Sequence, residues 1–279
     1  MSRINDCFAR LGAAGRKALV PYLMAGDPSP GDTVPLMHAL AAAGADIIEL
    51  GVPFTDPMAD GPVIQAAGER ALAAGMNLTK VLGLMHEFRR DDARTPVVLM
   101  GYQNPIEAMG VERFTAAAAA AGVDGVLTVD LPPEEAGGLL GALGAPQSPA
   151  PIFLLSPTTT PERIRRIVSV ARGFVYYVSL KGVTGSDRID PADIAPKVAA
   201  IRQLTDLPVG VGFGIRDGDT AARIAQMADA VVVGSALVGV IAAAGDAPAR
   251  LSAASQFVAG LRRAMDAAVR APAAAGEVA

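Results

Sequence analysis

The feature that most constrains this chain is an alternation of short apolar runs with longer amphipathic stretches. Short, almost unbroken apolar runs are typical of parallel strands that are buried on both faces. The eight runs are 19–24, 46–52, 96–102, 125–129, 152–156, 174–179, 208–212 and 230–234. Stretches with helical periodicity lie between them, among them 33–43, 111–121, 161–171 and 220–227. Ser29, Thr160 and Asp190 each precede a proline, which is typical of a helix start.

Eight strands, each followed by a helix, in a chain of 279 residues predict a single (β/α)8 TIM barrel. Ile4, Cys7, Phe8 and Leu11 have helical spacing and predict an extra N-terminal helix packed on the core. A doubly wound open sheet is the alternative, but no GxGxxG follows the first strand. We therefore expect one domain over residues 1–268 and a frayed, Ala-rich tail over 269–279.

Composition excludes several other classes. Hydrophobic residues make up 51% of the chain and charged residues 19%, which is unlike a disordered protein. A net charge of −4 does not favour nucleic-acid binding. The longest apolar run, 230–245, is shorter than the roughly 20 residues of a membrane span and is predicted to be a strand that leads into a helix. The N-terminus lacks a signal peptide's apolar core, so we expect a cytoplasmic protein.

The sequence contains few residues that could form a disulfide or bind a metal ion. Cys7 is the single cysteine, and the histidines are His38 and His86, both in predicted helices. One thiol cannot form an internal disulfide, and a structural zinc site needs more thiols or imidazoles. We expect no metal site.

One carboxylate stands in a predicted strand that is otherwise apolar. Glu49 lies between Ile48 and Leu50 in the segment DIIELGVPF. If its neighbours face the helices, Glu49 faces the barrel interior near the C-terminal end of the strand, where barrel active sites lie. Burial there raises the pKa of a carboxyl group and suits it to proton transfer. The alternative is a structural carboxylate paired with a backbone amide or a lysine.

The next loop, PFTDPMADGP, adds Asp56 and Asp60. Asp60-Gly61 alone is typical of a turn with a helix cap, but its place after Glu49 predicts two carboxylates facing one cavity. Asp130 also ends a strand, and we expect it to support the site or to cap a helix. Asp124 precedes the same strand and is predicted to lie in a turn, with a supporting role as the alternative.

Glycine-rich strand ends predict a phosphate site. The segments VGVGFGIRDGD and VVVGSALV place Gly214, Gly234 and Ser235 where loops lead into helices. Backbone N–H groups at such helix starts bind anions, and barrels commonly hold phosphate after strands 7 and 8. The stretch 181–185 is long enough to act as a lid, the alternative being a plain surface loop.

Several segments in this order resemble the tryptophan synthase alpha subunit family. They are ELGVPFTDPMADGPVIQ, YQNP, SPTTTPERI, YYVSLKGVTG, VGFGI and ADAVVVGSAL, and the resemblance covers residues 4–265. It implies a lyase of tryptophan biosynthesis that cleaves indole-3-glycerol phosphate by a retro-aldol reaction into indole and glyceraldehyde 3-phosphate. Thr55 replaces a serine that is often seen in the first segment.

The resemblance also implies roles for individual residues. Glu49 is implied as the acid and base at indole C3 and the glycerol hydroxyl, Asp60 as the partner of the indole N–H, and Tyr176 as an active-site tyrosine. Phosphate contacts are implied for Gly185, Gly214, Gly234 and Ser235. Apolar indole contacts are implied for Tyr22, Met100, Leu127 and Phe213. Thr184 is expected to bond Asp60 when the lid closes.

A partner follows from the resemblance and not from residue chemistry. It implies an α2β2 heterotetramer with a beta subunit that carries pyridoxal phosphate, and no cofactor in this chain. The segments with Pro53, Asp56, Asn104 and Pro132 are implied to face that partner. The sequence departs from the common family pattern at Tyr22, at Met24 and at Leu180-Lys181 in the lid.

Two other functions remain as alternatives. A Schiff-base aldolase would use Lys181, the lysine nearest the predicted site, although a Schiff-base lysine is normally held on a strand and desolvated. A non-catalytic regulatory subunit would have no need of Glu49, Asp60 and the phosphate loops. A metal-dependent aldolase is disfavoured because neither histidine lies at a strand end.

Overall fold

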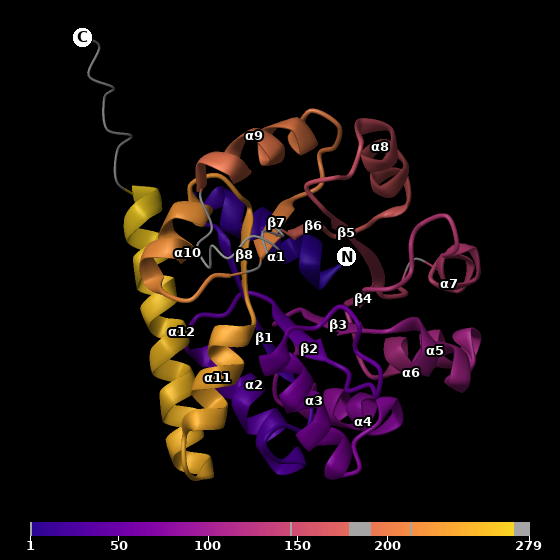
Figure 1. Ribbon diagram of the computed structural model, residues 1–279, viewed down its shortest axis with the longest axis vertical. Coiled ribbons are helices and arrows are strands. Elements are labelled where there is room, and N and C mark those ends of the chain that lie inside the picture. Colours follow the sequence, from indigo (N-terminus) through magenta and orange to yellow (C-terminus); the bar gives the residue numbers. More distant parts are fainter. Residues whose placement is uncertain (1, 146, 179–190, 213, 271–279) are drawn as a thin grey trace.

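The computed structural model describes residues 2–145, 147–178, 191–212 and 214–270. Within them eight parallel strands pair in chain order and close into a barrel, which confirms the predicted architecture (Figure 1). The strands are β1 (Ala18–Met24), β2 (Ile48–Gly51), β3 (Val97–Gly101), β4 (Gly125–Thr128), β5 (Ala150–Leu155), β6 (Val175–Val178), β7 (Val209–Gly212) and β8 (Ala230–Val233).

Helices surround the barrel as a second layer (Figure 1). In chain order the helices between strands are the 3-10 turn η1 (Pro30–Asp32), α2 (Thr33–Ala42), α3 (Pro62–Ala73), α4 (Leu78–Phe88), α5 (Gln103–Met109), α6 (Val111–Ala120), α7 (Gly137–Ala142), α8 (Pro161–Val170), α9 (Pro191–Arg202) and α10 (Gly218–Ala225). After β8 come α11 (Ser235–Ala243) and α12 (Ala247–Arg270). The apolar run 230–245 is thus a strand followed by a helix, as predicted. None of the described helices is long and apolar enough to cross a membrane.

The extra N-terminal helix α1 (Arg3–Ala13) covers the N-terminal end of the barrel. It buries Ile4, Cys7 and Leu11, the face that the helical spacing predicted. Ile4 reaches Gly125 and Gly173 so closely that a Cβ on either glycine would come within 3.3 Å of it. The C-terminal end, where sites of this fold lie, is not covered by α1.

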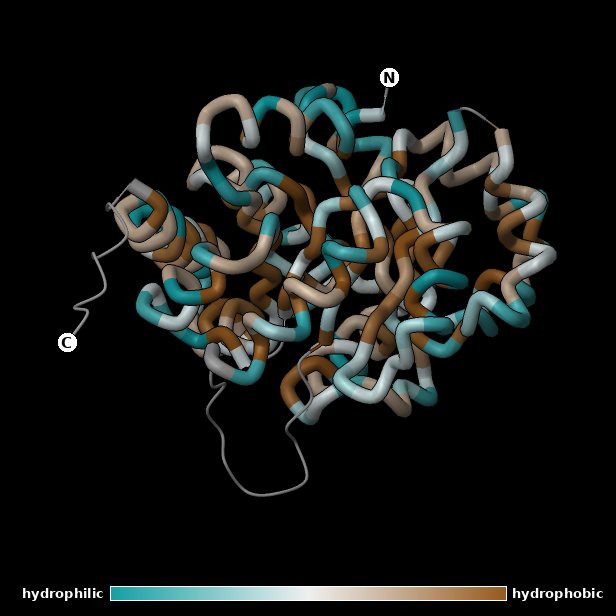
Figure 2. Tube along the Cα trace, turned by 90° about the horizontal axis from the view of Figure 1, so that it is seen from above, coloured by the Kyte–Doolittle hydropathy of each residue, from teal (hydrophilic) through white to brown (hydrophobic). Residues whose placement is uncertain are grey.

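Apolar side chains form two cores. One lies inside the barrel under α1, and the other lies between the strands and the outer helices. In Figure 2 the hydrophobic stretches run through the middle of the molecule, and the hydrophilic ones follow mainly the outer turns.

Three aspartates at the N-terminal end tie neighbouring strands together. Asp46, Asp124 and Asp229 precede β2, β4 and β8, and each donates its backbone N–H to a carbonyl of the preceding strand. The residues that provide these carbonyls are Leu19, Val97 and Val209, respectively. Each of them also donates its own backbone N–H to the carboxylate of the same aspartate. The paired bonds hold the start of one strand at a set register against the next.

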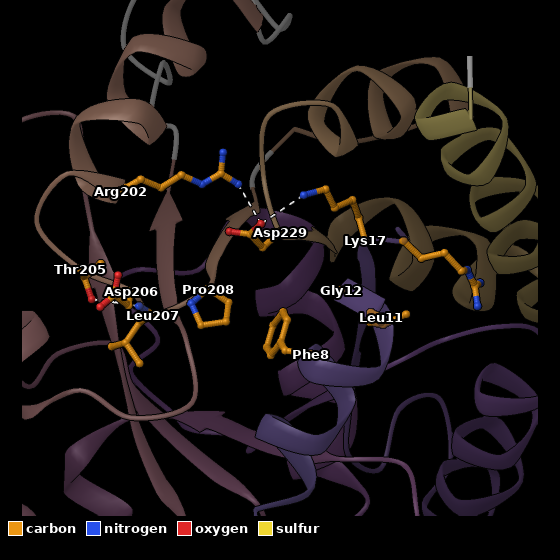
Figure 3. A pocket seen from close by; sticks show the side chains of 11 residues that line it. Phe8, Leu11, Gly12, Lys17, Arg202, Thr205, Asp206, Leu207, Pro208 and Asp229 are labelled. Carbon is orange, nitrogen blue, oxygen red and sulfur yellow. Dashed lines mark hydrogen bonds and ion pairs between the residues drawn. The ribbon is translucent and has the colours of Figure 1, made fainter. Parts of the chain in front are cut away.

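Each of these aspartates also binds cations. The guanidinium groups of Arg262, Arg89 and Arg202 lie 3.0, 2.6 and 2.8 Å from Asp46, Asp124 and Asp229 respectively. Figure 3 shows Arg202 and Lys17 reaching Asp229 from two sides, above Phe8 and Pro208, at a cavity of about 390 Å³. This cavity is therefore at the end of the barrel remote from the predicted site.

Candidate active site

Glu49 lies on β2 and faces the barrel interior. Its neighbours Ile48 and Leu50 belong to the outer core, whereas Ile47 belongs to the core inside the barrel. In the parallel register Glu49 is level with Tyr22 of β1 and Val98 of β3. The side chain is 2% exposed. The orientation expected from the sequence is therefore confirmed.

Burial dominates the chemistry of Glu49. Desolvation raises its pKa to about 8. Within the described part of the chain, neither a backbone amide nor a lysine is paired with this carboxyl group, which argues against a purely structural carboxylate. A carboxyl group in this environment is mostly protonated at neutral pH and can donate a proton.

Asp60 is held in the loop between β2 and α3. Its backbone N–H donates to the Pro57 carbonyl at 3.1 Å, and its own carbonyl accepts the Gln65 side-chain amide at 2.9 Å. Burial raises the pKa of Asp60 to about 6, and a hydrogen bond from Tyr102 opposes the rise. Above pH 6 Asp60 is therefore mainly an anion.

Tyr102 is a site residue that the sequence analysis missed. Its hydroxyl accepts the Ala59 N–H at 3.0 Å and donates to the Asp60 side chain. Its ring packs on the Phe54 ring, with 5.2 Å between the centroids, so the loop contacts Tyr102 through Phe54 as well as through Ala59. The available signal was its position directly after β3, in the YQNP segment, where a polar side chain ends a buried strand.

Two further tyrosines stand inside the barrel against glycines. Tyr22 of β1 lies over Gly51, and Tyr176 of β6 lies over Gly212. A Cβ on Gly51 or Gly212 would come within 2.1 or 2.2 Å of the respective hydroxyl oxygen. Burial and then the charge of Glu49 raise the pKa of Tyr176 well above its usual value, so its hydroxyl lies in the field of Glu49.

The expected apolar contacts line the same space. Met100 of β3 and Leu127 of β4 pack with the core inside the barrel, and in the strand register both are level with Gly51, two residues beyond Glu49. Together with Tyr22 they form an apolar wall beside a buried carboxyl group.

The glycines expected to bind phosphate follow β7 and β8. Gly214 has a φ of 72°, a left-handed conformation that favours glycine. Gly234 precedes the first residue of α11, Ser235, and no side chain caps this helix start. Its N–H groups are thus available to an anion. A Cβ on Gly234 would lie 3.8 Å from that of Tyr22, so this helix start adjoins the apolar wall.

Other predicted residues have different outcomes. Thr184, Gly185, Lys181 and Phe213 lie outside the described residues. Asp130 is exposed and accepts the Gln103 N–H at the start of α5, which is the capping role. Asp124 lies at the opposite end of the barrel, so the alternative that it supports the site is wrong.

The described residues contain no group of three His, Cys, Asp or Glu side chains placed to share a metal ion. Asp56 is exposed, and the Thr55 hydroxyl donates to its carboxylate. Among the described residues, burial raises the pKa of two carboxyl groups at the C-terminal end of the barrel, those of Glu49 and Asp60.

Comparison with known proteins gives one consistent family. A family model described as tryptophan synthase alpha chain matches residues 8–269. The tryptophan synthase alpha chain of Thioalkalivibrio sulfidiphilus is 62% identical over 267 residues, covering 95% of this chain and 100% of that protein.

Solved structures agree with this result. The crystal structure of tryptophan synthase subunit alpha from Legionella pneumophila has a TM-score of 0.90 and 43% identity, and the match covers 96% of this chain and 99% of that one. Tryptophan synthase from M. tuberculosis in an aminoacrylate-bound form matches with a TM-score of 0.82 and 38% identity, over 94% of this chain and 100% of that one.

Proposed function

This chain belongs to the tryptophan synthase alpha chain family, and we propose that Glu49 and Asp60 carry out its reaction. The protein is a lyase of tryptophan biosynthesis that cleaves indole-3-glycerol phosphate to indole and glyceraldehyde 3-phosphate. The observation that carries the assignment of residues is the difference between the two carboxyl groups. The pKa of Glu49 is about 8 and that of Asp60 about 6, so between these values one is an acid and the other an anion.

Glu49 performs the proton transfers. The Glu49 carboxyl group donates its proton to indole C3, and the ring becomes a cation. The resulting carboxylate then removes the proton of the glycerol hydroxyl next to C3. The C–C bond breaks as the hydroxyl carbon becomes the aldehyde, the bonding electron pair returns to the indole ring, and Glu49 is again protonated.

Asp60 stabilises the intermediate. Its carboxylate accepts a hydrogen bond from the indole N–H, where the positive charge develops after C3 is protonated. A fixed anion in a partly desolvated site stabilises such a charge more strongly than water does. Tyr102, the Ala59 N–H and Gln65 support this arrangement because they hold the loop that carries Asp60.

The rest of the site binds the substrate. Tyr22, Met100, Leu127 and Phe213 contact the indole ring, and the Tyr176 hydroxyl lies in the field of Glu49. The phosphate is bound by Gly185, Gly214, Gly234 and Ser235, with the free N–H groups of α11 as the main support. Thr184 bonds Asp60 when the lid closes over the substrate.

The partner is the beta subunit of tryptophan synthase, and the two chains form an α2β2 heterotetramer in the cytoplasm. Pyridoxal phosphate belongs to the beta subunit, and this chain works without a cofactor. The loop after β2, which carries Asp60, supports a contact there, since its Met58 is 86% exposed. Pro53, Asp56, Asn104 and Pro132 lie on the contacting segments.

The direct test is product analysis. Purified protein is incubated with indole-3-glycerol phosphate, and indole and glyceraldehyde 3-phosphate are quantified. We expect equal amounts of both, no loss of activity after treatment with a chelator, and no inactivation by borohydride in the presence of substrate. Borohydride trapping of a lysine would support the Schiff-base alternative, and absence of both products would support a non-catalytic subunit.

A further inference from the structure

Tyr22 carries a buried hydroxyl without a strong acceptor. The residue is 5% exposed, and within the described part of the chain its hydroxyl donates to one atom, the Met24 thioether sulfur, at 4.0 Å. A thioether is a weak acceptor. A buried donor without a good acceptor destabilises a fold by about 1–3 kcal/mol, and a phenylalanine would avoid this at the same position.

The position of this hydroxyl is set by β1 and β2. Tyr22 is level with Glu49 in the strand register, and its hydroxyl lies over Gly51, two residues further along β2. Because a Cβ on Gly51 would lie 2.1 Å from the oxygen, the hydroxyl occupies the space that a side chain would fill. The hydroxyl therefore lies beside the C-terminal end of β2, from which the Asp60 loop departs.

The charged groups that face the Tyr22 hydroxyl come from several elements. Burial raises the pKa of Tyr22 most, followed by the charges of Asp60 and Glu49, and then by Tyr102 and Asp27. Asp27 is neutralised by Arg70, which donates to it at 2.6 Å. Asp60 and Glu49, the two carboxyl groups of the site, therefore both act on this hydroxyl, and the effect of Asp60 is the larger.

Asp60 has room for another donor. An ionised carboxylate has about four acceptor positions. Tyr102 occupies one of them, and Asp60 is half-buried, so water reaches the others in the free protein. An indole ring in the site removes that water, and an anion that loses water needs a replacement donor.

We propose that Tyr22 is a positioning residue whose hydroxyl donates a second tyrosine hydrogen bond to the Asp60 carboxylate in the substrate complex. This inference rests on the function proposed above, in which Asp60 stabilises the indole cation. Tyr102 from β3 and Tyr22 from β1 then hold the carboxylate from two sides, aimed at the indole N–H. The hydroxyl acts on the reaction through Asp60 and not on the substrate itself.

The test compares Tyr22→Phe with wild type in complex with the beta subunit, by the pH dependence of kcat for indole release. A hydrogen bond from Tyr22 favours the anion, so its loss raises the pKa of Asp60 in the complex. The acid limb of kcat is expected to move to higher pH by about 0.5–1 pH unit. At a pH on the acid side of the limb, kcat is then roughly 3- to 10-fold lower than in wild type. The alkaline limb should stay at the same pH, and KM should change less than twofold. Tyr102→Phe should move the same limb, and the double variant should move it further.

Tyr177→Phe is the matched control. Tyr177 lies on β6, is 3% exposed and packs in the core between strands and helices, away from Asp60. It should leave the acid limb unchanged. The melting temperature of Tyr22→Phe should be equal to or above that of wild type, which separates the effect from misfolding.

Three results would overturn the proposal while leaving the function intact. The first is an acid limb that does not move in an active Tyr22→Phe protein. The second is a shift of the alkaline limb instead, which would assign the hydroxyl to Glu49, and the third is a change confined to KM, which would leave Tyr22 as an apolar contact. Failure of the proposed function is distinguished by Asp60→Asn, which would then retain the turnover and acid limb of wild type.

Discussion

At the scale of single residues, the two carboxyl groups predict the pH dependence of the reaction. Cleavage needs Asp60 ionised, which is lost below about pH 6, and Glu49 protonated, which is lost above about pH 8. We expect a bell-shaped profile of kcat/KM with limbs near these values, because kcat/KM reports the free enzyme. Measurement of indole release from pH 5 to 9 provides the check. A profile that still rises above pH 9 would exclude Glu49 as the initial acid.

Glu49 also predicts a dependence of stability on pH. Its folded pKa, about 8, lies above the usual value of 4.5, so between these values the folded protein keeps a proton that the unfolded chain has lost. The contribution of Glu49 to the free energy of unfolding therefore falls as pH rises through this range.

Glu49→Gln removes this dependence. A pKa difference of one corresponds to about 1.4 kcal/mol, so at pH 7 the free energy of unfolding of the variant is expected to exceed that of wild type by on the order of 3 kcal/mol. The difference should vanish below pH 4.5 and level off above pH 8. Urea unfolding of both proteins at pH 5, 7 and 9 tests this, and a gap that stays constant with pH would show that titration of Glu49 is not its cause.

At the scale of elements, the aspartates before β2, β4 and β8 are expected to carry much of the stability of the N-terminal end. Asp124→Ala leaves the Arg89 side chain, which is 9% exposed, without its carboxylate, and leaves the Val97 N–H without its acceptor. Removal of one partner of a buried ion pair destabilises a fold by about 3–5 kcal/mol.

Chemical unfolding measures this loss directly. The matched control is Asp91→Ala, an exposed aspartate for which we expect a change within about 0.5 kcal/mol. Activity per folded molecule should be unchanged in Asp124→Ala, because Asp124 lies at the end of the barrel remote from Glu49. Equal stability of the two variants would contradict the role assigned to these aspartates.

The elements also show how far sequence patterns reach. Unbroken apolar runs predicted all eight strands because both faces of each strand are buried, and the helical spacing of Ile4, Cys7 and Leu11 predicted the buried face of α1. The ends of the predicted runs differ from the observed strand ends by at most two residues. Asp46 was included in the second run, although it lies before β2 and binds Leu19 and Arg262 across the barrel end. Such partners are distant in sequence, so no local pattern predicts them.

The same limit applies to the site. Glu49 could be predicted because a carboxyl group interrupts an apolar strand. The position of Tyr102 at the end of a buried strand marks it as a candidate, but its role could not be predicted, because that role depends on Ala59 and Asp60, which approach it only when the loop after β2 folds over β3. Gly51 likewise resembles an ordinary strand glycine until Tyr22 is seen to occupy the space beside it.

At the scale of the whole molecule, the two ends of the barrel have separate tasks. Ion pairs and α1 close the N-terminal end, and the C-terminal end carries Glu49, the Asp60 loop and the start of α11. This division is typical of (β/α)8 barrels, in which stability and chemistry are assigned to opposite faces.

The exposed methionine beside the site predicts how the partner binds. Met58 is 86% exposed on the loop that carries Asp60, and burial of a methionine is worth about 1.5–3 kcal/mol. Met58→Asp should weaken association with the beta subunit at least tenfold, as measured by titration calorimetry. Cleavage by the isolated chain should change less than twofold. Unchanged affinity would place the contact elsewhere.

Single-turnover indole release by Glu49→Gln and Asp60→Asn shows whether Glu49 and Asp60 carry the cleavage. Loss of a positioned acid or base lowers a rate by about 10²–10⁴. We expect Glu49→Gln to lose at least that much and Asp60→Asn to be strongly reduced, since its amide is uncharged. Both should stay folded and bind indole-3-glycerol phosphate. Turnover like that of wild type in either folded variant would exclude the substituted carboxyl group from the reaction.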